Sequence, residues 1–528
     1  MIQATRIHSR AAPETARAAA LAAALLLLLG GGCGQEQDTG PVPPGPPHPA
    51  GRLVDLRPLS ASADLRIVDD RDRDILLRGV NITSLGEYWQ GDPLHPPTLP
   101  TTDEDWDAMA ARGVSVVRLV MHWSRIEPER GVIDHGYLDE LDDYVRQAAQ
   151  RGIYTVLDMH QDAYSAFIFT PPGEECPPGT HPAKGWDGAP RFAVFTDGLS
   201  TCTPGERNAS AAVQNAWNAF YDNREGIRDQ FVLAWAAVAE RFAGRPEVAG
   251  LNLLNEPEVS RPARQLQPLY DRLLEETYLA IRSAQAGAPF EHLIFVEPAI
   301  PAGNPGYGLV LPNIRGMSTE FSNVVSAPHN YAETIGLPGI SISFEIMTQI
   351  FLFLARFYGV PTWVGEYGFW DTSPETLEKL DRYARDEDAN LLGGAWWQWR
   401  QPCGDPHSLG PTGPYTVVHL NALGCPGDID LGPTEPFMRV LARGYPRAAP
   451  GRLVSLVSKP ETGALSVEAV ATEPAGAPLV VWTPTAADTH AVETTGLERV
   501  LQHDVPGGRI VTAFPSAPGP YFLRVAPR

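Results

Sequence analysis

The sequence predicts an α/β protein, a (β/α)8 TIM barrel followed by a small C-terminal β-sandwich. Two observations support the barrel. Short β-branched runs alternate with amphipathic helical patterns from about residue 65 to about residue 445, and eight such runs occur. This alternation indicates a parallel sheet covered by helices, and eight repeats of it indicate a closed barrel. The sandwich rests on a third observation, because beyond residue 448 the runs follow the two-residue period of strands.

Residues 1–33 are typical of an export signal. Three arginines precede the apolar run AAALAAALLLLLGGG, and Cys33 follows it at once. A basic region, a short apolar region and small residues define a secretory signal, and the run is short for a spanning helix. Cys33 resembles the lipidated cysteine of a bacterial lipobox. We therefore expect an exported protein, either a cell-envelope lipoprotein or a secreted protein, with an uncleaved anchor as the alternative. Residues 34–55 are rich in proline and glycine and indicate a linker.

The barrel is expected over residues 56–447. Its eight strands are predicted in the runs ILLRGVNI, SVVRLVMHW, IYTVLDMHQ, EVAGLNLLNEP, HLIFVEP, NVVSAPHNY, PTWVGEYG and LGGAWWQW. Helical patterns lie between them at residues 103–113, 137–152, 227–244, 263–285 and 375–388. In the second of these, apolar residues recur at helical spacing and acidic residues fill the other face. Gly113 and Gly152 each stop a helix just before a strand.

The segment 340–359, ISISFEIMTQIFLFLARFYG, is unusually apolar. One interpretation is a helix that covers the barrel after the sixth strand. The other is that its N-terminal end lines a slot for acyl chains or contacts a lipid surface, with Phe167, Ile168 and Phe169 as an opposite wall. A large exposed apolar patch would favour the second interpretation.

Residues 448–528 predict the sandwich through the segments ALSVEAVA, PLVVWTP, GRIVTAF and YFLRVA. Four cysteines remain besides Cys33, and an even number in an exported chain favours disulfides. Proximity favours Cys176–Cys202 and Cys403–Cys425, and the other two pairings stay open. No cysteine has zinc-ligand spacing with a histidine, so we predict no metal site.

Composition limits the partners. The chain of 528 residues is long enough for a large barrel and a further module. Its net charge of −22 excludes a nucleic-acid partner, because phosphate binding needs a basic surface. The acidic charge also gives no electrostatic attraction to anionic lipid, so membrane contact would need an anchor or an apolar patch. We expect a monomer that acts on a neutral substrate.

Polar and aromatic residues follow nearly every predicted strand, where such barrels place their chemistry. Two carboxylates are prominent, Glu256 after the fourth strand and Glu366 after the seventh. Glycoside hydrolysis needs two carboxyl groups beside the scissile bond, about 5–5.5 Å apart in a retaining enzyme. Each could instead be a capping or rim acid. The convergence of histidine, asparagine, tyrosine and tryptophan favours a catalytic pair.

The segments NEP and GEYG resemble the acid/base and nucleophile strands of glycoside hydrolase family 5. Further landmarks follow in the order of that family: Arg118 in VVRLVMHW, His160 in LDMHQD, Asn255 before the acid, His329 and Tyr331 in PHNY, and Trp397 in GAWWQW, with Trp396 and Trp399 as alternatives. The resemblance spans about residues 65 to 445. It implies a retaining β-glycosidase that needs no cofactor.

The resemblance also implies roles. Glu366 would attack the anomeric carbon while Glu256 protonates the leaving oxygen, so Glu256 has to hold a proton near neutral pH. We expect the second carboxylate and partial burial to raise the pKa of Glu256. Arg118 would orient Glu366, and Tyr331 would donate a hydrogen bond to it. Asn255 would hold the 2-hydroxyl group of the sugar, and an aromatic platform, Trp397, would stack on the ring.

A narrower resemblance comes from LDMHQDAYS and WSRIEPERGVID, which are similar to segments of endoglycoceramidases and related glycolipid glycosidases. It implies that His160 and Asp162 contact sugar hydroxyls, and that the C-terminal sandwich is the usual partner of the barrel. The segment VNITSLGEYWQGDP departs from this resemblance, because it contains no lysine. Members that cleave oligosaccharide headgroups tend to carry a lysine near this position that contacts the headgroup. The candidates here are Glu87, Tyr88 and Trp89, which leaves a monosaccharide headgroup or a sterol aglycone open.

Two other functions stay open. One is a retaining β-glycanase or β-glucosidase that acts on soluble glucan, mannan or steryl glucoside. The other is a surface lipoprotein that binds carbohydrate without cleaving it, although the presence of both carboxylates disfavours this alternative. Fold alone does not separate these functions. The main expectation is hydrolysis of the bond between a sugar headgroup and a lipid aglycone.

Overall fold

The computed structural model describes residues 51, 53–86, 88, 98–314, 321–335, 342–403, 419–424, 427–472, 476–486 and 488–528. The predicted signal, Cys33 and most of the linker lie outside these residues, as do Glu87 and Trp89. All elements below belong to the unit Pro47–Arg528. Among the described helices, none has both the length and the apolar character needed to cross a membrane.

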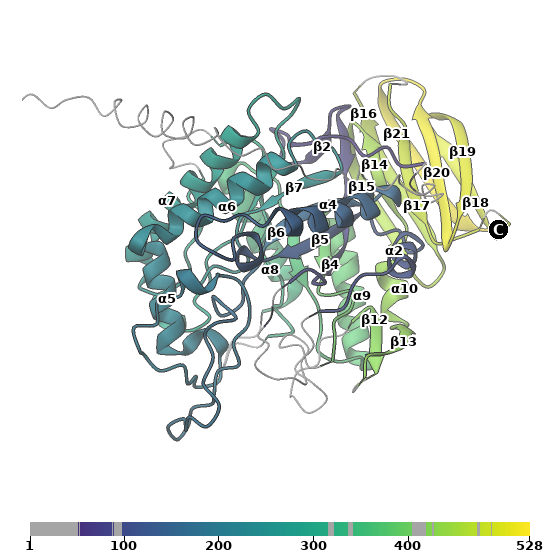
Figure 1. The fold of residues 1–528 in the computed structure, drawn as a ribbon. Coiled ribbons are helices and arrows are strands. Elements are labelled where there is room, and N and C mark those ends of the chain that lie inside the picture. Colours follow the sequence, from purple (N-terminus) through teal and green to yellow (C-terminus); the bar gives the residue numbers. More distant parts are fainter. Residues whose placement is uncertain are drawn as a thin grey trace, which may run out of the picture. The chain divides into compact units, whose positions relative to one another are not determined.

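Eight parallel strands form the predicted barrel (Figure 1). They are β4 (Arg78–Ile82), β5 (Val116–Met121), β6 (Tyr154–Met159), β7 (Val248–Asn252), β8 (Leu293–Val296), β9 (Val324–Ser326), β10 (Val364–Tyr367) and β11 (Gly394–Trp396). The sheet runs in the order β10-β11-β4-β5-β6-β7-β8-β9. Parallel bridges from Ser326 to Thr362 and from His329 to Glu366 join its two edges. The barrel is therefore closed, and all eight predicted strands are confirmed.

Helices cover the strands, and every predicted helical pattern forms one. The helices are α2 (Asp103–Ala110), α3 (Trp123–Ile126), α4 (His135–Gln150), α5 (Ala211–Tyr221), α6 (Ile227–Arg241), α7 (Ala263–Ala284), α8 (Phe344–Tyr358), α9 (Pro374–Ala389) and α10 (Phe437–Leu441). Gly113 and Gly152 adopt φ angles of 75° and 71°, as the predicted helix stops require. β5 and β6 are buried along their whole length because helices cover their outer face.

The C-terminal region is a sandwich of two antiparallel sheets. Its strands are β14 (Tyr445–Pro450), β15 (Arg452–Lys459), β16 (Ala464–Ala471), β17 (Leu479–Thr483), β18 (His490–Thr495), β19 (Leu497–Val505), β20 (Gly508–Pro515) and β21 (Gly519–Pro527). One sheet has the order β15-β16-β21-β18, and the other contains β14-β17-β20-β19. A separate hairpin, β12 (Asn421–Gly424) and β13 (Ile429–Pro433), follows the last barrel strand.

Three strands that precede the barrel complete the larger sheet of the sandwich. β1 (Leu59–Ala61), β2 (Ile67–Asp69) and β3 (Arg73–Ile75) extend it through antiparallel pairing of β3 with β14. The sequence analysis assigned these residues to the barrel, and its boundary between residues 447 and 448 falls inside β14. Both ends of this unit thus contribute to one sheet.

The barrel and the sandwich share a hydrophobic core. Barrel residues such as Val116 and Val156 lie in one cluster with sandwich residues such as Leu453 and Trp482. The Trp482 indole donates a hydrogen bond to the carbonyl of Ala442 (3.2 Å) and packs so closely against Gly113 that a Cβ there would lie 2.2 Å from it. The sandwich therefore supports the end of the barrel at which the strands begin.

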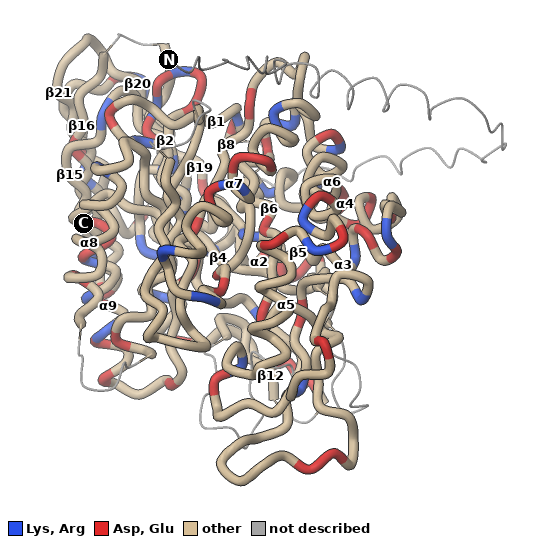
Figure 2. The backbone as a smooth tube through the Cα atoms, turned by 90° about the vertical axis from the view of Figure 1, so that its left-hand side faces the viewer, with Lys and Arg blue, Asp and Glu red and all other residues tan. Residues whose placement is uncertain are grey.

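Charge is dispersed over the described part of the chain. Figure 2 shows lysine and arginine positions scattered among acidic ones. No basic stripe of the kind that tracks a phosphate backbone is visible there.

Because Trp482 fills the space between the two domains, we expect Trp482→Ala to lower the free energy of unfolding by about 3–5 kcal/mol. Urea unfolding followed by circular dichroism measures this loss. Val454→Ala is the control, because Val454 lies on β15 with an exposed side chain. A loss below about 1 kcal/mol for the tryptophan variant would contradict a shared core.

Candidate active site

The predicted site residues meet at the carboxyl ends of the barrel strands. They are Arg118 on β5, His160 and Asp162 after β6, Asn255 and Glu256 after β7, His329 and Tyr331 after β9, Glu366 on β10 and Trp397 after β11. All lie at the end of the barrel where such folds carry their active sites. Most are buried, and Glu256, His329 and Tyr331 are partly exposed.

The two candidate carboxylates face each other across His329. One oxygen of Glu256 and one of Glu366 lie within 4.8 Å of each other. His329 Nδ1 is 2.9 Å from Glu256 Oε1 and 3.5 Å from Glu366 Oε2. The Tyr331 hydroxyl donates to Glu366 Oε2 at 3.0 Å. This separation suits the retaining mechanism, in which no water has to fit between the two carboxyl groups.

Arg118 lies beneath the pair as a fully buried cation. Its Nη1 donates to Glu366 Oε1 at 2.7 Å, and its Nη2 donates to Asn255 Oδ1 at 2.8 Å. The same Nη2 lies 2.9 Å from Asp158 and 3.0 Å from Glu297. Burial alone would lower the pKa of Arg118, but the carboxylates raise it above its usual value. The guanidinium therefore stays charged and fixes the orientation of Glu366.

The backbone at Glu256 explains how a strand delivers a carboxylate into the barrel mouth. Glu256 has a φ of 36°, a left-handed conformation that side chains other than glycine adopt at a cost of about 1–3 kcal/mol. Two side chains hold it there. The Glu256 N–H donates to Glu297 Oε2 at 2.8 Å, and the Gln161 amide donates to the Glu256 carbonyl at 3.0 Å.

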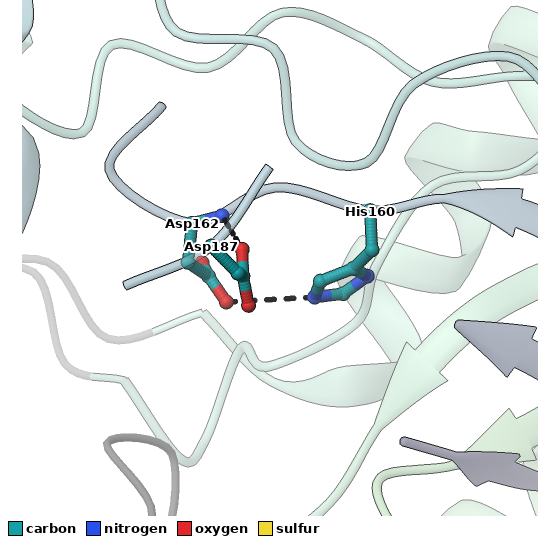
Figure 3. A group of neighbouring side chains, drawn as sticks. All are labelled: His160, Asp162 and Asp187. Carbon is teal, nitrogen blue, oxygen red and sulfur yellow. Dashed lines mark hydrogen bonds and ion pairs between the residues drawn. The ribbon is translucent and has the colours of Figure 1, made fainter. Parts of the chain in front are cut away.

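His160, Asp162 and Asp187 form a second cluster (Figure 3). His160 Nδ1 lies 2.7 Å from Asp158, and Nε2 lies 3.4 Å from Asp162. Burial alone would lower the pKa of His160, but these two carboxylates raise it to about 10. An imidazolium donates hydrogen bonds and carboxylates accept them, so the cluster offers both kinds of partner that sugar hydroxyls need.

Three tryptophans follow β11, and their environments separate them. The Trp397 ring stacks on His160, a member of the second cluster, at 5.3 Å between centroids. Trp396 is fully buried in the main core. Trp399 is also buried there and donates its indole N–H to Asp105 at 3.0 Å. Of the three, Trp397 is the one placed for an aromatic platform.

A long insertion between β6 and α5 carries residues that the sequence analysis missed. The predicted Cys176–Cys202 disulfide is confirmed and closes this insertion. Cys425 lies outside the described residues, so the second predicted pair stays a prediction. The insertion delivers Asp187, which accepts a hydrogen bond from the Asp162 N–H, and Arg207. No periodic pattern in this segment marks either residue.

Arg207 contacts both halves of the site. Its Nη2 pairs with Asp162 and lies 3.4 Å from Glu256 Oε2. Its guanidinium lies over the Trp186 ring, 4.8 Å from the ring centroid. Although the side chain is 32% exposed, two carboxylates and one aromatic face hold it in place.

The charges around Glu256 correct one expectation. Burial would raise the pKa of Glu256, but the hydrogen bond from His329 and the charge of Arg207 lower it below its usual value. Burial raises the pKa of Glu366, against the effect of His329 and Arg118. The expectation that the pKa of Glu256 is raised is therefore wrong, because two cations, His329 and Arg207, face it.

The closed barrel and the paired carboxylates define a retaining glycoside hydrolase. A family model described as cellulase, glycosyl hydrolase family 5, matches residues 68–402. The chain belongs to this family. Its members are retaining enzymes, as the separation of Glu256 and Glu366 requires.

Several known proteins are similar to the chain over most of its length. Endoglycoceramidase I of Rhodococcus hoagii (strain 103S) is 25% identical over 487 residues, which cover 87% of this chain and 86% of the relative. A crystal structure of an endogalactoceramidase is 34% identical, with a TM-score of 0.79, and covers 90% of this chain and 100% of its own. The lactosyl-enzyme intermediate of endo-glycoceramidase II from Rhodococcus sp. is 25% identical, with a TM-score of 0.65, over 87% of this chain and 99% of that one.

Removal of the buried cation should destabilise the fold. We expect Arg118→Met to cost about 3–5 kcal/mol at neutral pH, because three carboxylates would lose their partner. The loss should shrink as the pH falls, since protonation of those carboxylates removes their repulsion. Urea unfolding of parent and variant at several pH values measures both effects. A loss that is independent of pH would argue against a role for Arg118 as the neutralising charge.

Proposed function

We propose that this protein hydrolyses the glycosidic bond between a sugar headgroup and ceramide in a glycolipid. The observation that supports this most directly is the pair of carboxylates within 4.8 Å at the barrel mouth. It occurs in a chain that is 34% identical to an endogalactoceramidase over 90% of its length. The C-terminal sandwich belongs to the same matched region.

In the proposed mechanism, the Glu366 carboxylate attacks the anomeric carbon while Glu256 gives a proton to the glycosidic oxygen. The bond from the anomeric carbon to that oxygen breaks, ceramide leaves as an alcohol, and a glycosyl ester forms on Glu366. Water then attacks the same carbon, Glu256 takes the proton of the water, and Glu366 leaves as a carboxylate. Two inversions retain the configuration.

The roles of the surrounding residues follow from their contacts. Arg118 and Tyr331 each donate to one oxygen of Glu366, which orients the nucleophile. Asn255 accepts from Arg118 through its oxygen and turns its amide nitrogen toward His160, at 3.4 Å from Nε2. We assign it to the 2-hydroxyl group. His160 and Asp162 bind further hydroxyls of the sugar.

For the headgroup, we propose a single sugar such as galactose or glucose. The segment after β4 contains no lysine up to residue 94. Of the three candidates in that segment, Tyr88 is the one that the structure describes, and its ring is buried edge-on against His122, with the two ring centroids 5.3 Å apart. The likeness to an endogalactoceramidase supports the same choice. Steryl glucoside and soluble glucan remain the alternatives to test.

We further propose that α8 rests on the lipid surface that holds the substrate. Ile346, Ile350, Phe353 and Phe357 recur at helical spacing and are 56%, 42%, 65% and 57% exposed. Because α8 follows β9, the N-terminal end of this apolar stripe lies on the side of the barrel mouth. The predicted opposite wall of Phe167, Ile168 and Phe169 has less support, because Ile168 is buried in the core.

The export signal supports the same setting. A lipid anchor at Cys33 would hold the enzyme at a cell envelope, and residues 34–55 would give it reach. The apolar stripe on α8 would then turn the mouth toward glycolipid. Membrane contact through these two features is part of the proposal.

Hydrolysis of a substrate panel tests the function. The parent, Glu256→Gln and Glu366→Gln are incubated with galactosylceramide, glucosylceramide, lactosylceramide, steryl glucoside and cellotetraose. We expect the parent to release intact sugar from a glycolipid and each variant to lose at least about a thousandfold in rate. An aryl glycoside whose leaving group needs no proton should restore bond cleavage in the Glu256 variant but not in the Glu366 variant.

Other outcomes of the panel have definite meanings. Cleavage of cellotetraose alone would make the protein a soluble glucan hydrolase. Tight binding of a sugar without turnover by the parent would favour the non-catalytic alternative. Equal activity of the parent and both variants would exclude the paired-carboxylate mechanism.

The lipid contact predicts a selective defect. We expect Phe353→Asp to lower the hydrolysis rate of vesicle-bound glycolipid about tenfold, because a charge on the stripe opposes contact with the bilayer. Hydrolysis of a soluble aryl glycoside should stay unchanged. Val457→Asp, at an exposed apolar position of the sandwich, is the control. Equal losses on both substrates would contradict a role in lipid contact.

A further inference from the structure

We infer that Arg207 is a positioning residue that holds the Glu256 carboxylate and joins it to the sugar-binding Asp162. This inference rests on the proposed function, because it concerns the acid/base of that reaction. Arg207 reaches Asp162 and Glu256 with the same nitrogen, Nη2. One cation therefore contacts the group that donates the proton and the group that binds the sugar.

Hydrogen bonds of the neighbouring residues fix the backbone position of Arg207. It begins a short 3-10 helix, η2 (Arg207–Ala209), whose next residue, Ser210, caps the start of α5. Glu206 accepts from the Asn208 N–H at 2.7 Å. Gln214 donates to the Asn208 carbonyl at 2.9 Å. The backbone of Asn208, directly after Arg207, is thus held by hydrogen bonds at both its N–H and its carbonyl.

The disulfide fixes the approach of the insertion to this point. Cys176 and Cys202 are joined, and His181 pairs with Thr203 through two backbone hydrogen bonds of 2.8 and 2.9 Å. Arg207 follows within five residues of the bridge. Trp186, from inside the closed loop, supplies the aromatic face on which the guanidinium lies. The insertion thus supplies both Arg207 and the ring of Trp186 that supports it.

Charged groups face Glu256 from five directions. Arg207 comes from the insertion, His329 from the segment after β9, and Asp162 from the segment after β6. Glu297, at the end of β8, holds the Glu256 N–H, and Glu366 lies opposite on β10. His329 also lies 3.4 Å from Glu297 and 3.5 Å from Glu366. Arg207 is the cation that acts on Glu256 from the sugar-binding side.

The chemical consequence concerns the alkaline limit of activity. Glu256 has to be protonated to cleave the glycosidic bond, and a neighbouring cation favours its ionised form. With Arg207 present, Glu256 therefore loses its proton at a lower pH than it would without this cation. Loss of the cation should let Glu256 keep its proton to higher pH, so the alkaline limb of the kcat/KM profile should move upward.

The first test is the pH profile of Arg207→Met on the best substrate of the panel. We expect the alkaline limb to move up by about one pH unit and KM to rise, because Asp162 loses its partner. Arg207→Lys keeps the charge and should leave the limb near its original position. Arg191→Met is the matched control, since Arg191 lies in the same insertion with its guanidinium 4.5 Å from the Phe167 ring centroid. An unmoved limb in a folded Arg207→Met variant would overturn the inference.

A second measurement does not depend on turnover. Carboxyl carbon NMR of 13C-glutamate-labelled protein follows the titration of Glu256, which is identified by the signal that Glu256→Gln removes. The pKa of Glu256 should rise in Arg207→Met and stay near the parent value in Arg207→Lys. An unchanged pKa would overturn the inference even if no glycolipid were cleaved. If the parent cleaved no glycoside while this pKa rose, the proposed function alone would fail.

The closed loop offers a third comparison. In Cys176→Ser/Cys202→Ser the insertion loses its covalent closure but keeps Arg207. A shift of the alkaline limb in the same direction as in Arg207→Met, and smaller, would support delivery of Arg207 by the loop. If the alkaline limb of the double serine variant stays at the parent position while that of Arg207→Met shifts, the disulfide has no role in positioning Arg207.

Discussion

The site depends on one buried cation. Arg118 lies in the centre of the barrel, fully enclosed, with Asp158, Glu297 and Glu366 around its guanidinium. Three carboxylates could not be buried together without it, because each would bear its own desolvation cost as well as the repulsion of the others. With Arg118 present, the strands can end on acids, and Glu366 has one definite orientation.

Arg118 contacts Glu366 but not Glu256, so the charge of Glu256 is balanced by cations from other segments. His329 is placed between Glu256 and Glu366 by the segment after β9, and Arg207 reaches Glu256 from the insertion after β6. The barrel strands thus supply Arg118 and Glu366, whereas segments beyond the strands supply His329 and Arg207. This division suits an enzyme whose chemistry is shared by a family while its substrate varies, because loops change more readily than barrel strands.

The residues that sequence predicted well lie on or next to strands. Arg118, which the resemblance of VVRLVMHW to a family strand predicted, lies on β5 and donates a hydrogen bond to Glu366. The order of such runs placed Glu256 and Glu366 at one end of the barrel. The direction of the pKa shift of Glu256 could not be predicted, because it depends on two cations that are distant in sequence. His329 lies 73 residues away, and Arg207 lies 49 residues away in a segment without periodicity.

The sequence by itself determined the strand and helix order and the candidate pair of carboxylates, and it favoured the Cys176–Cys202 bridge, because these depend on local periodicity and short spacing. Only the tertiary structure decided which cations face each carboxylate and that β1 to β3 complete the sheet of the sandwich. Those contacts join segments up to 405 residues apart, as between Arg73 and Pro478. Chain folding brings such segments together through the packing of whole elements, and no local pattern encodes that packing.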